Sequence, residues 1–184
     1  MRFWISLVGY QLVWFSAVIG AGHGHVWPGV LGWLLYASVQ LALSRQPKAD
    51  LALMATAILM GFMLDGVMAR SGWGNYAAAW PSPTMAPAWI LALWATFALT
   101  FTQSLAVLQT RPRIAALLGL IGGPLAYLSA SRGWHAVTLA EPTWRGLAWL
   151  AAGWALATPA LAWLARRWSH PNDMAPGMPG GLSS

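Results

Sequence analysis

The chain has 184 residues, of which 58% are hydrophobic and 8% are charged. Soluble domains carry about 25% charged residues. Ten Lys and Arg with four Asp and Glu are therefore too few to cover a globule of this size. The composition excludes an ordinary soluble enzyme, a disordered chain and a coiled coil. The chain contains no Cys, which excludes a disulfide scaffold, a thiolate metal site and a cysteine nucleophile.

Six apolar segments approach or exceed the roughly 20 residues that a membrane-spanning helix needs. They are residues 3–21, 26–43, 51–69, 86–108, 114–130 and 144–165. The first segment could instead be a secretory signal. Its run is long, its charged flank is one Arg and Gln11 interrupts it, so we expect it to be retained. The sequence predicts an all-α, polytopic six-helix transmembrane bundle over residues 1–168. A Pro- and Gly-rich tail over 169–184 is expected to be disordered and cytoplasmic.

The basic residues that flank these segments predict the orientation, because cytoplasmic loops carry an excess of Lys and Arg. The side that holds both termini has seven basic residues, and the other side has three, namely Arg70, Arg132 and Arg145. We therefore expect a bacterial inner-membrane protein with both termini in the cytoplasm. The net charge of +6 does not indicate nucleic-acid binding, because the basic residues lie singly or in pairs between apolar runs.

The chain contains fourteen Trp residues, and most of them lie near the ends of predicted spans. This placement is typical of an aromatic belt at the membrane interface. Only Trp94 and Trp154 lie deep enough to suggest an aromatic-lined pocket. The longest loop, residues 70–85, contains Gly, Pro, Trp and Tyr, and we expect it to lie on the outer bilayer surface.

Asp65 is the main ionisable residue within a predicted span, and such residues are costly enough to be functional candidates. One interpretation is structural, with hydrogen bonds to neighbouring helices or an Arg partner. The other is a ligand-binding or proton-carrying carboxylate. Tyr127 lies at a similar predicted depth, which suggests a polar pocket that opens toward the outer side. Gln11, near the middle of the first span, is a further ligand-binding candidate.

The fourth and fifth spans carry further polar and small residues with helical spacing. Thr96, Thr100, Gln103 and Ser104 would share one helical face. They would serve either interhelical hydrogen bonding or a cavity lining. Gly119 and Gly123 form a GxxxG pair that lets two helices approach closely, and Pro124 would open the helix and expose carbonyl groups. The kink-forming Pro159 lies in the last span.

Further polar residues are predicted just outside Asp65 and Tyr127. Arg132 completes the set of ligand-binding candidates, with Asp65, Tyr127, Gln11, Thr100, Gln103 and Ser104. His23, His25 and His135 are weak candidates for a copper or zinc site, and ordinary interfacial histidines are the alternative. We assign no catalytic residue and expect no cofactor.

Residues 65–70 read DGVMAR, which is similar to the core motif of CDP-alcohol phosphotransferases, a family of six-helix membrane enzymes. Enzymes of that family bind their metal through several further carboxylates of the motif. The corresponding positions here include Phe62, Pro83 and Pro87. One carboxylate cannot assemble that metal site, so the motif match is not taken to indicate this activity.

The layout resembles the uncharacterised bacterial membrane family named domain of unknown function 2878. The resemblance covers residues 4–165 and is carried by VGYQLVWF at 8–15 and GFMLDGVM at 61–68. Its most specific parts are APAWILALWATFALTFTQSL at 86–105 and GGPLAYLSA at 122–130. The resemblance implies no assigned activity. It implies a lipid-linked role, because such families accompany genes for fatty-acyl modification.

The sequence favours a binding or accessory module in the bilayer that handles a lipid or assembles with a membrane partner. The polar residues within the predicted spans, which are energetically costly in a bilayer, are too few to form an evident catalytic site. A small proton-coupled transporter or flippase is the first alternative, and a membrane enzyme that acts on lipid is the second. The expected partners are the bilayer, a lipid or another membrane protein, and no nucleic acid.

Overall fold

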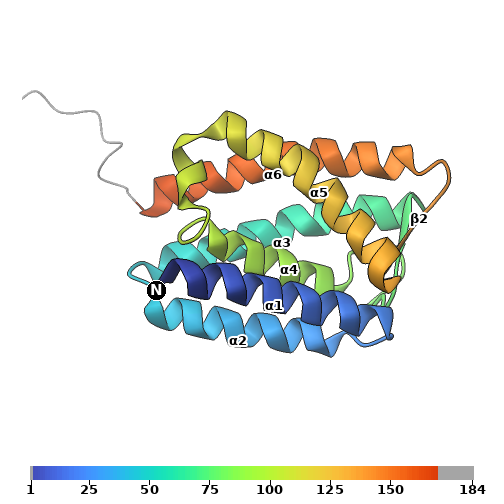
Figure 1. Cartoon of the computed structure of the whole chain (residues 1–184), viewed down its shortest axis with the longest axis horizontal. Helices are drawn as coiled ribbons and strands as arrows, with labels where there is room; N and C mark the ends of the chain where they lie inside the picture. Colours follow the sequence, from blue (N-terminus) through green and yellow to red (C-terminus); the bar gives the residue numbers. More distant parts are fainter. Residues whose placement is uncertain (1, 170–184) are drawn as a thin grey trace, which may run out of the picture.

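The computed structural model describes residues 2–169, which contain six α-helices, one 3-10 helix and one two-stranded ribbon (Figure 1). The elements are α1 Arg2–Gly22, α2 Trp27–Leu43, α3 Pro47–Arg70, β1 Gly74–Tyr76, α4 Ala88–Thr100, η1 Ala106–Thr110, α5 Pro112–Trp134, β2 Val137–Leu139 and α6 Trp144–Ser169. The predicted all-α class is confirmed. Helices α1, α3, α5 and α6 are long and apolar enough to cross a membrane, whereas α2 and α4 are shorter apolar helices. Apart from Ser169, the predicted tail lies outside the described residues.

Proline residues mark the beginnings of three helices. Pro28, Pro47 and Pro112 lie in the first turns of α2, α3 and α5, where a missing N–H costs no helical hydrogen bond. Pro124 and Pro159 lie inside α5 and α6, and both helices continue through them. Helix α5 is therefore not broken at Pro124, contrary to expectation, although the carbonyl of Leu120 lacks its usual helical donor because proline has no N–H.

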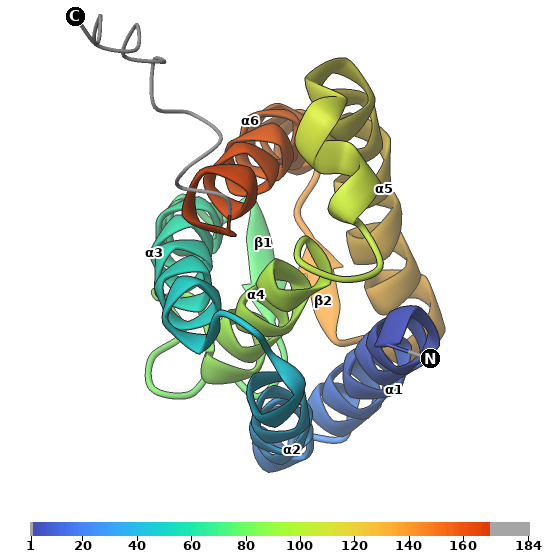
Figure 2. The ribbon, with the colours of Figure 1, turned by 90° about the vertical axis from the view of Figure 1, so that its left-hand side faces the viewer.

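Helix α4 lies at the centre of the bundle and is surrounded by the other helices (Figure 2). Nine of its 13 residues are buried, and a helix that is apolar on all sides is typical of a core position. The predicted span over 86–108 is wrong at its end, because α4 stops at Thr100 and is followed by turns and η1. The hydroxyl groups of Thr100 and Thr102 donate to nearby carbonyls of Phe97 and Leu99, and such bonds compete with helical ones.

The early end of α4 also corrects the predicted polar face. Gln103 and Ser104 lie in the turn after the helix, so they do not share a helical face with Thr96 and Thr100. The hydroxyl groups of Thr96 and Thr100 donate to carbonyls of their own helix. These residues are buried packing elements rather than a polar stripe.

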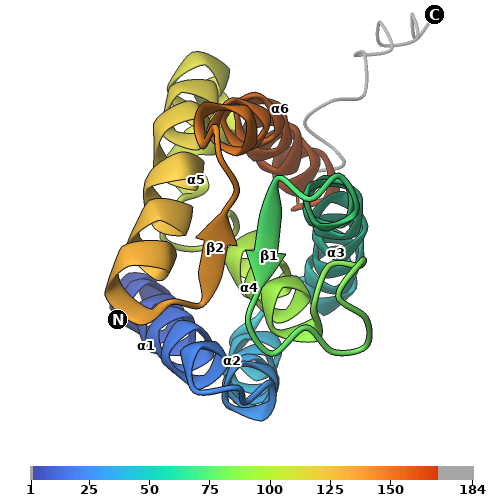
Figure 3. The same ribbon diagram turned by 90° about the vertical axis from the view of Figure 1, so that its right-hand side faces the viewer.

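The ribbon of β1 and β2 lies across one end of the bundle, between α3 and α5 (Figure 3). The strands are antiparallel, with Gly74 opposite Leu139 and Tyr76 opposite Val137. Gly74 and Tyr76, which belong to the loop expected at the outer bilayer surface, are buried within the protein, as is Val137 of β2. Strand pairing satisfies the polar groups of this buried backbone inside the protein. We call this end of the bundle the ribbon end.

Helices α5 and α6 pack closely through the predicted small-residue pair. A Cβ atom at Gly119 would meet the backbone oxygen of Trp154, and one at Gly123 would meet the Trp154 ring. The GxxxG pair therefore serves packing within the chain.

The outer faces of the helices around α4 are apolar. Leu12 is 66% exposed, Leu35 is 69% exposed and Leu156 is 74% exposed, and they lie on α1, α2 and α6. Soluble proteins rarely expose large continuous apolar surfaces. Together with the four helices long enough to span, this surface indicates a membrane protein.

Candidate functional site

Asp65 lies in α3, close to the ribbon end, and is completely buried. The hydroxyl groups of Tyr76 and Tyr127 donate to its Oδ1 atom, and Nε1 of Trp94 donates to Oδ2 at 2.7 Å. The Tyr76 hydroxyl lies 2.7 Å from Oδ1. All three donors are uncharged, so hydrogen bonds rather than an ion pair stabilise this carboxylate. We call Asp65, Tyr76, Trp94 and Tyr127 the carboxylate cluster.

The carboxylate cluster joins four elements of the fold. Asp65 comes from α3, Tyr76 from β1, Trp94 from α4 and Tyr127 from α5. Gly61, one turn before Asp65, makes room for Trp94, because a Cβ atom there would collide with the indole ring. The Trp94 ring stacks on Trp154 of α6, with ring centroids 4.1 Å apart and planes at 17°. One buried carboxylate thereby fixes side chains from β1, α4 and α5, and Trp94 extends the contact to α6.

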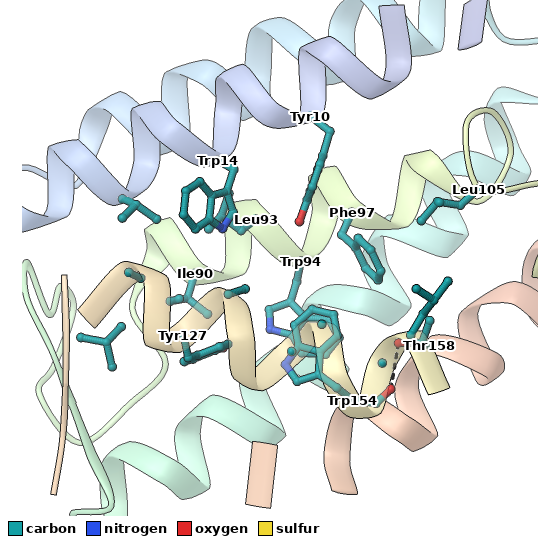
Figure 4. Close-up of a pocket in the computed structure, with 18 of the residues that line it drawn as sticks. Tyr10, Trp14, Ile90, Leu93, Trp94, Phe97, Leu105, Tyr127, Trp154 and Thr158 are labelled. Carbon is teal, nitrogen blue, oxygen red and sulfur yellow. Dashed lines mark hydrogen bonds between the residues drawn. The ribbon is translucent and has the colours of Figure 1, made fainter. Parts of the chain in front are cut away.

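Beside this cluster lies a partly enclosed cavity of about 240 Å³ between α1, α4, α5 and α6 (Figure 4). Its walls are apolar and contain seven aromatic residues, namely Tyr10, Trp14, Trp89, Trp94, Phe97, Tyr127 and Trp154. Trp94 and Tyr127 belong to both the cavity wall and the carboxylate cluster. Asp65 itself does not line the cavity. It contributes to the shape of the cavity by holding the side chains of Trp94 and Tyr127 in place.

Helix α5 carries the lining residues at which the cavity reaches the surface, and α1 forms a neighbouring wall. The two helices meet at the ribbon end, where the Trp134 ring packs edge-on against Trp14 and Phe15 at 5.6 and 5.7 Å. Further along α5, the lining residues Leu118 and Gly122 are exposed. A Cβ atom at Gly122 would meet nothing within 4 Å. These positions lie about 9 and 15 Å from the start of a helix about 34 Å long, in its first half.

The residues that line this cavity also carry polar groups. The Tyr10 hydroxyl points into it from α1 (Figure 4). The Nε1 atom of Trp154 is buried and has no hydrogen-bond partner within residues 2–169, a state shared with Trp33 outside the cavity. No charged side chain lines the cavity among the residues that the structure describes.

The structure brings together only some of the predicted site residues. Asp65 and Tyr127 are in contact, and of the predicted ligand-binding residues only Tyr127 lines the cavity. Trp94 and Trp154, which the sequence suggested for an aromatic-lined pocket, also line it. Ser104 is buried near the opposite end, where its hydroxyl lies 3.0 Å from that of Ser6. Thr100 is buried on α4, and Gln103 is half-buried beyond its end. The exposed residues are Gln11, Arg132, His23, His25 and His135. Within residues 2–169 no group of three metal-ligating side chains is found.

Asp50 is a second buried carboxylate, which the sequence analysis did not single out. Asp50 lies in the first turn of α3 and accepts hydrogen bonds from Ser44 at 2.5 Å and Thr102 at 3.0 Å. These bonds tie the α2–α3 loop to the turn that ends α4. Asp50 lies just before the predicted span, beside Lys48, where an acidic residue is ordinary, so no signal in the sequence distinguished it.

The buried hydroxyl of Tyr76 makes stability sensitive to alkaline pH. Burial, then the nearby Asp65 carboxylate, raises the pKa of Tyr76 well above its ordinary value of 10.0. Between these two pKa values the folded chain keeps a proton that the unfolded chain has released, so stability falls as pH rises above 10.0. We expect thermal stability to drop between about pH 9 and pH 11. The drop should be shallower in Tyr76→Phe, and an identical pH profile in this variant would contradict the expectation.

One of the comparisons with known proteins finds a match. The family model described as "Protein of unknown function (DUF2878)" matches residues 3–160. No curated protein and no solved structure matches the chain. Since the match covers well over half of the sequence, the chain belongs to the DUF2878 family.

Proposed function

We propose that this DUF2878 protein is a six-span protein of the bacterial inner membrane that binds a neutral, lipid-like molecule as a non-enzymatic binding or accessory module. The observation that carries the proposal is the cavity between α1, α4, α5 and α6, which opens beside the exposed lining residues Leu118 and Gly122 of α5. In a membrane, this opening would face hydrocarbon chains rather than water. The cavity is therefore placed to receive a molecule from the bilayer itself.

The positions of exposed Trp residues support insertion of the whole bundle. On α6, Trp144 and Trp163 are both exposed, and Arg145 and Arg167 lie over their rings. The two Trp residues are about 28 Å apart along the helix, close to the roughly 30 Å thickness of the hydrocarbon core. Aromatic and basic residues at both ends are typical of a span anchored at two interfaces. The shorter α2 and α4 run beside these long helices and would complete six spans.

The orientation can be tested with single cysteine variants, because the natural chain has none. Thr84 and Thr110 are both exposed, and lie beyond opposite ends of α4. We expect Thr84→Cys to react with a membrane-impermeant maleimide in spheroplasts, and Thr110→Cys to react only after the membrane is permeabilised. Equal labelling of both in intact spheroplasts, or the reverse pattern, would contradict the proposed topology.

The lining of the cavity defines the chemistry of the ligand. The absence of charged side chains from its walls, within the described part of the chain, disfavours an anionic head group. Its volume of about 240 Å³ is below the roughly 300–1,000 Å³ of pockets for drug-sized ligands. This space suits one substituted ring or part of one chain, with the remainder of the ligand left in the bilayer.

The proposal is tested by closing the opening from the α5 side. Gly122→Phe would put a ring into the open space at this position, while its neighbour Ile121 is half exposed to the outside. We expect native mass spectrometry to detect a bound small molecule on the wild-type protein and on the matched control Ile121→Phe, but not on Gly122→Phe. Equal binding by all three proteins, or by none of them, would overturn the proposal.

A further inference from the structure

The cavity is elongated along the helices that line it. Its lining residues on α5 recur at every turn from Leu118 to Ala130, a distance of about 18 Å along the helix. Those on α1 run from Tyr10 to Val18, which is about 12 Å. A volume of about 240 Å³ that is spread over such a length leaves a narrow cavity. Its long axis runs beside α5.

The two ends of this narrow cavity differ. At the ribbon end its lining includes Val18, Ala130 and Val137, all of which are buried. We call these three residues the closed end. In the first half of α5 the cavity reaches the surface beside Leu118 and Gly122, which are exposed. A ligand that enters beside these two residues therefore advances along α5 toward the closed end.

Most polar groups of the lining residues are engaged within the protein. Trp89 and Thr158 donate hydrogen bonds to backbone carbonyl groups, and Trp94 and Tyr127 donate to Asp65. These groups are therefore not free to bind a ligand. A polar head group that entered the cavity would lose its hydrogen bonds to water without adequate replacement. A hydrocarbon chain has no such bonds to lose.

The half-buried Tyr10 adds one hydroxyl to the lining, which is too few hydrogen-bonding groups for a lipid head group. We propose, on the basis of the proposed function, that the cavity binds one unbranched acyl chain of a bilayer lipid, methyl end first. The chain passes Gly122, lies along α5 and reaches the closed end, while its ester and head group stay outside. A compact hydrocarbon is equally apolar but too wide for a narrow cavity.

The test locates the two ends of a bound chain by photo-crosslinking. One phosphatidylcholine carries a diazirine near the methyl end of its palmitoyl chain, and a second carries it near the ester. Each lipid is irradiated with the protein in nanodiscs, and peptide mass spectrometry identifies the labelled residues. We expect the methyl-end probe to label the closed end and the ester-end probe to label only residues outside it. Adamantane diazirine, a compact hydrocarbon probe, should label exposed faces but not the closed end.

Two variants connect this labelling with the entrance. Gly122→Phe should abolish labelling of the closed end by the methyl-end probe. The matched control Ile121→Phe, at a half-exposed position outside the lining, should keep it. Undiminished labelling of a folded Gly122→Phe protein would overturn the proposed path. The comparison of the three probes uses the wild-type protein, so it does not depend on the folding of either variant.

The outcomes separate this inference from the proposed function. Labelling of the closed end by adamantane diazirine, or equally by the two lipid probes, overturns the acyl-chain assignment and leaves the proposed function standing. The same holds if neither lipid probe labels the closed end while native mass spectrometry still detects a bound molecule. No labelling of the closed end by any probe, together with no bound molecule, overturns both.

Discussion

Replacing Asp65 by alanine is expected to destabilise the fold strongly. The substitution leaves the hydroxyl groups of Tyr76 and Tyr127 and Nε1 of Trp94 without their common acceptor. A buried donor that loses its partner costs about 1–3 kcal/mol, so the three together should cost about 3 kcal/mol or more. Thermal unfolding in mild detergent, followed by Trp fluorescence, measures the effect.

Two further variants make this result specific. In Asp65→Asn one carboxylate oxygen becomes an NH₂ donor that faces another donor, so the loss should be smaller than in Asp65→Ala but still clear. Gln11→Ala removes an exposed polar residue and should change stability by less than about 0.5 kcal/mol. A wild-type melting temperature for Asp65→Ala would show that the carboxylate cluster does not hold these elements together.

Replacing Gly119 by alanine is expected to separate α5 from α6. The new methyl group would meet the backbone oxygen of Trp154 and lie 2.5 Å from Oγ1 of Thr158. Backbone cannot rotate away as a side chain can, so the helices must move apart. Overpacking of this kind costs about 1–3 kcal/mol, and here we expect the upper part of that range. The same shift would displace Trp154 from the cavity wall and weaken ligand binding.

Gly122 supplies the matched control on the same helix. A Cβ atom there meets nothing within 4 Å, so Gly122→Ala creates no clash. Since alanine is favoured over glycine within helices by about 1 kcal/mol, this variant should be as stable as the wild type or more stable. Chemical unfolding of both variants gives the comparison. Equal stability of Gly119→Ala and Gly122→Ala would contradict the close packing of α5 on α6.

The sequence predicted the long helices well because apolar length alone marks a membrane span. The predicted segments 3–21, 26–43 and 144–165 agree closely with α1, α2 and α6, and prolines explain several helix starts. The end of α4 was not predictable in this way. Residues 101–108 are as apolar as a helix requires and contain no Gly or Pro. The helix stops there through hydroxyl and amide bonds to carbonyls, which depend on tertiary placement.

The carboxylate cluster was predictable only in part. Depth along their helices places Asp65 near Tyr127, because both positions lie within spans and close to the same end. Tyr76 lies in a loop, and only the pairing of β1 with β2 brings its hydroxyl to Asp65. The polar residues that seemed suited to a pocket, such as Gln11 and Arg132, are exposed. The cavity is lined instead by apolar and aromatic residues, of which the sequence suggested Trp94, Trp154 and Tyr127 for a pocket.

A density map of the wild-type protein, purified in mild detergent from its own membrane, would test the central claim most directly. We expect density for a bound molecule in the cavity, in contact with Tyr10 and lying along α5, which continues past Gly122 to the outside of the bundle. A map in which α1 closes onto α5, with side chains filling the cavity and no bound molecule, would contradict the proposed binding function.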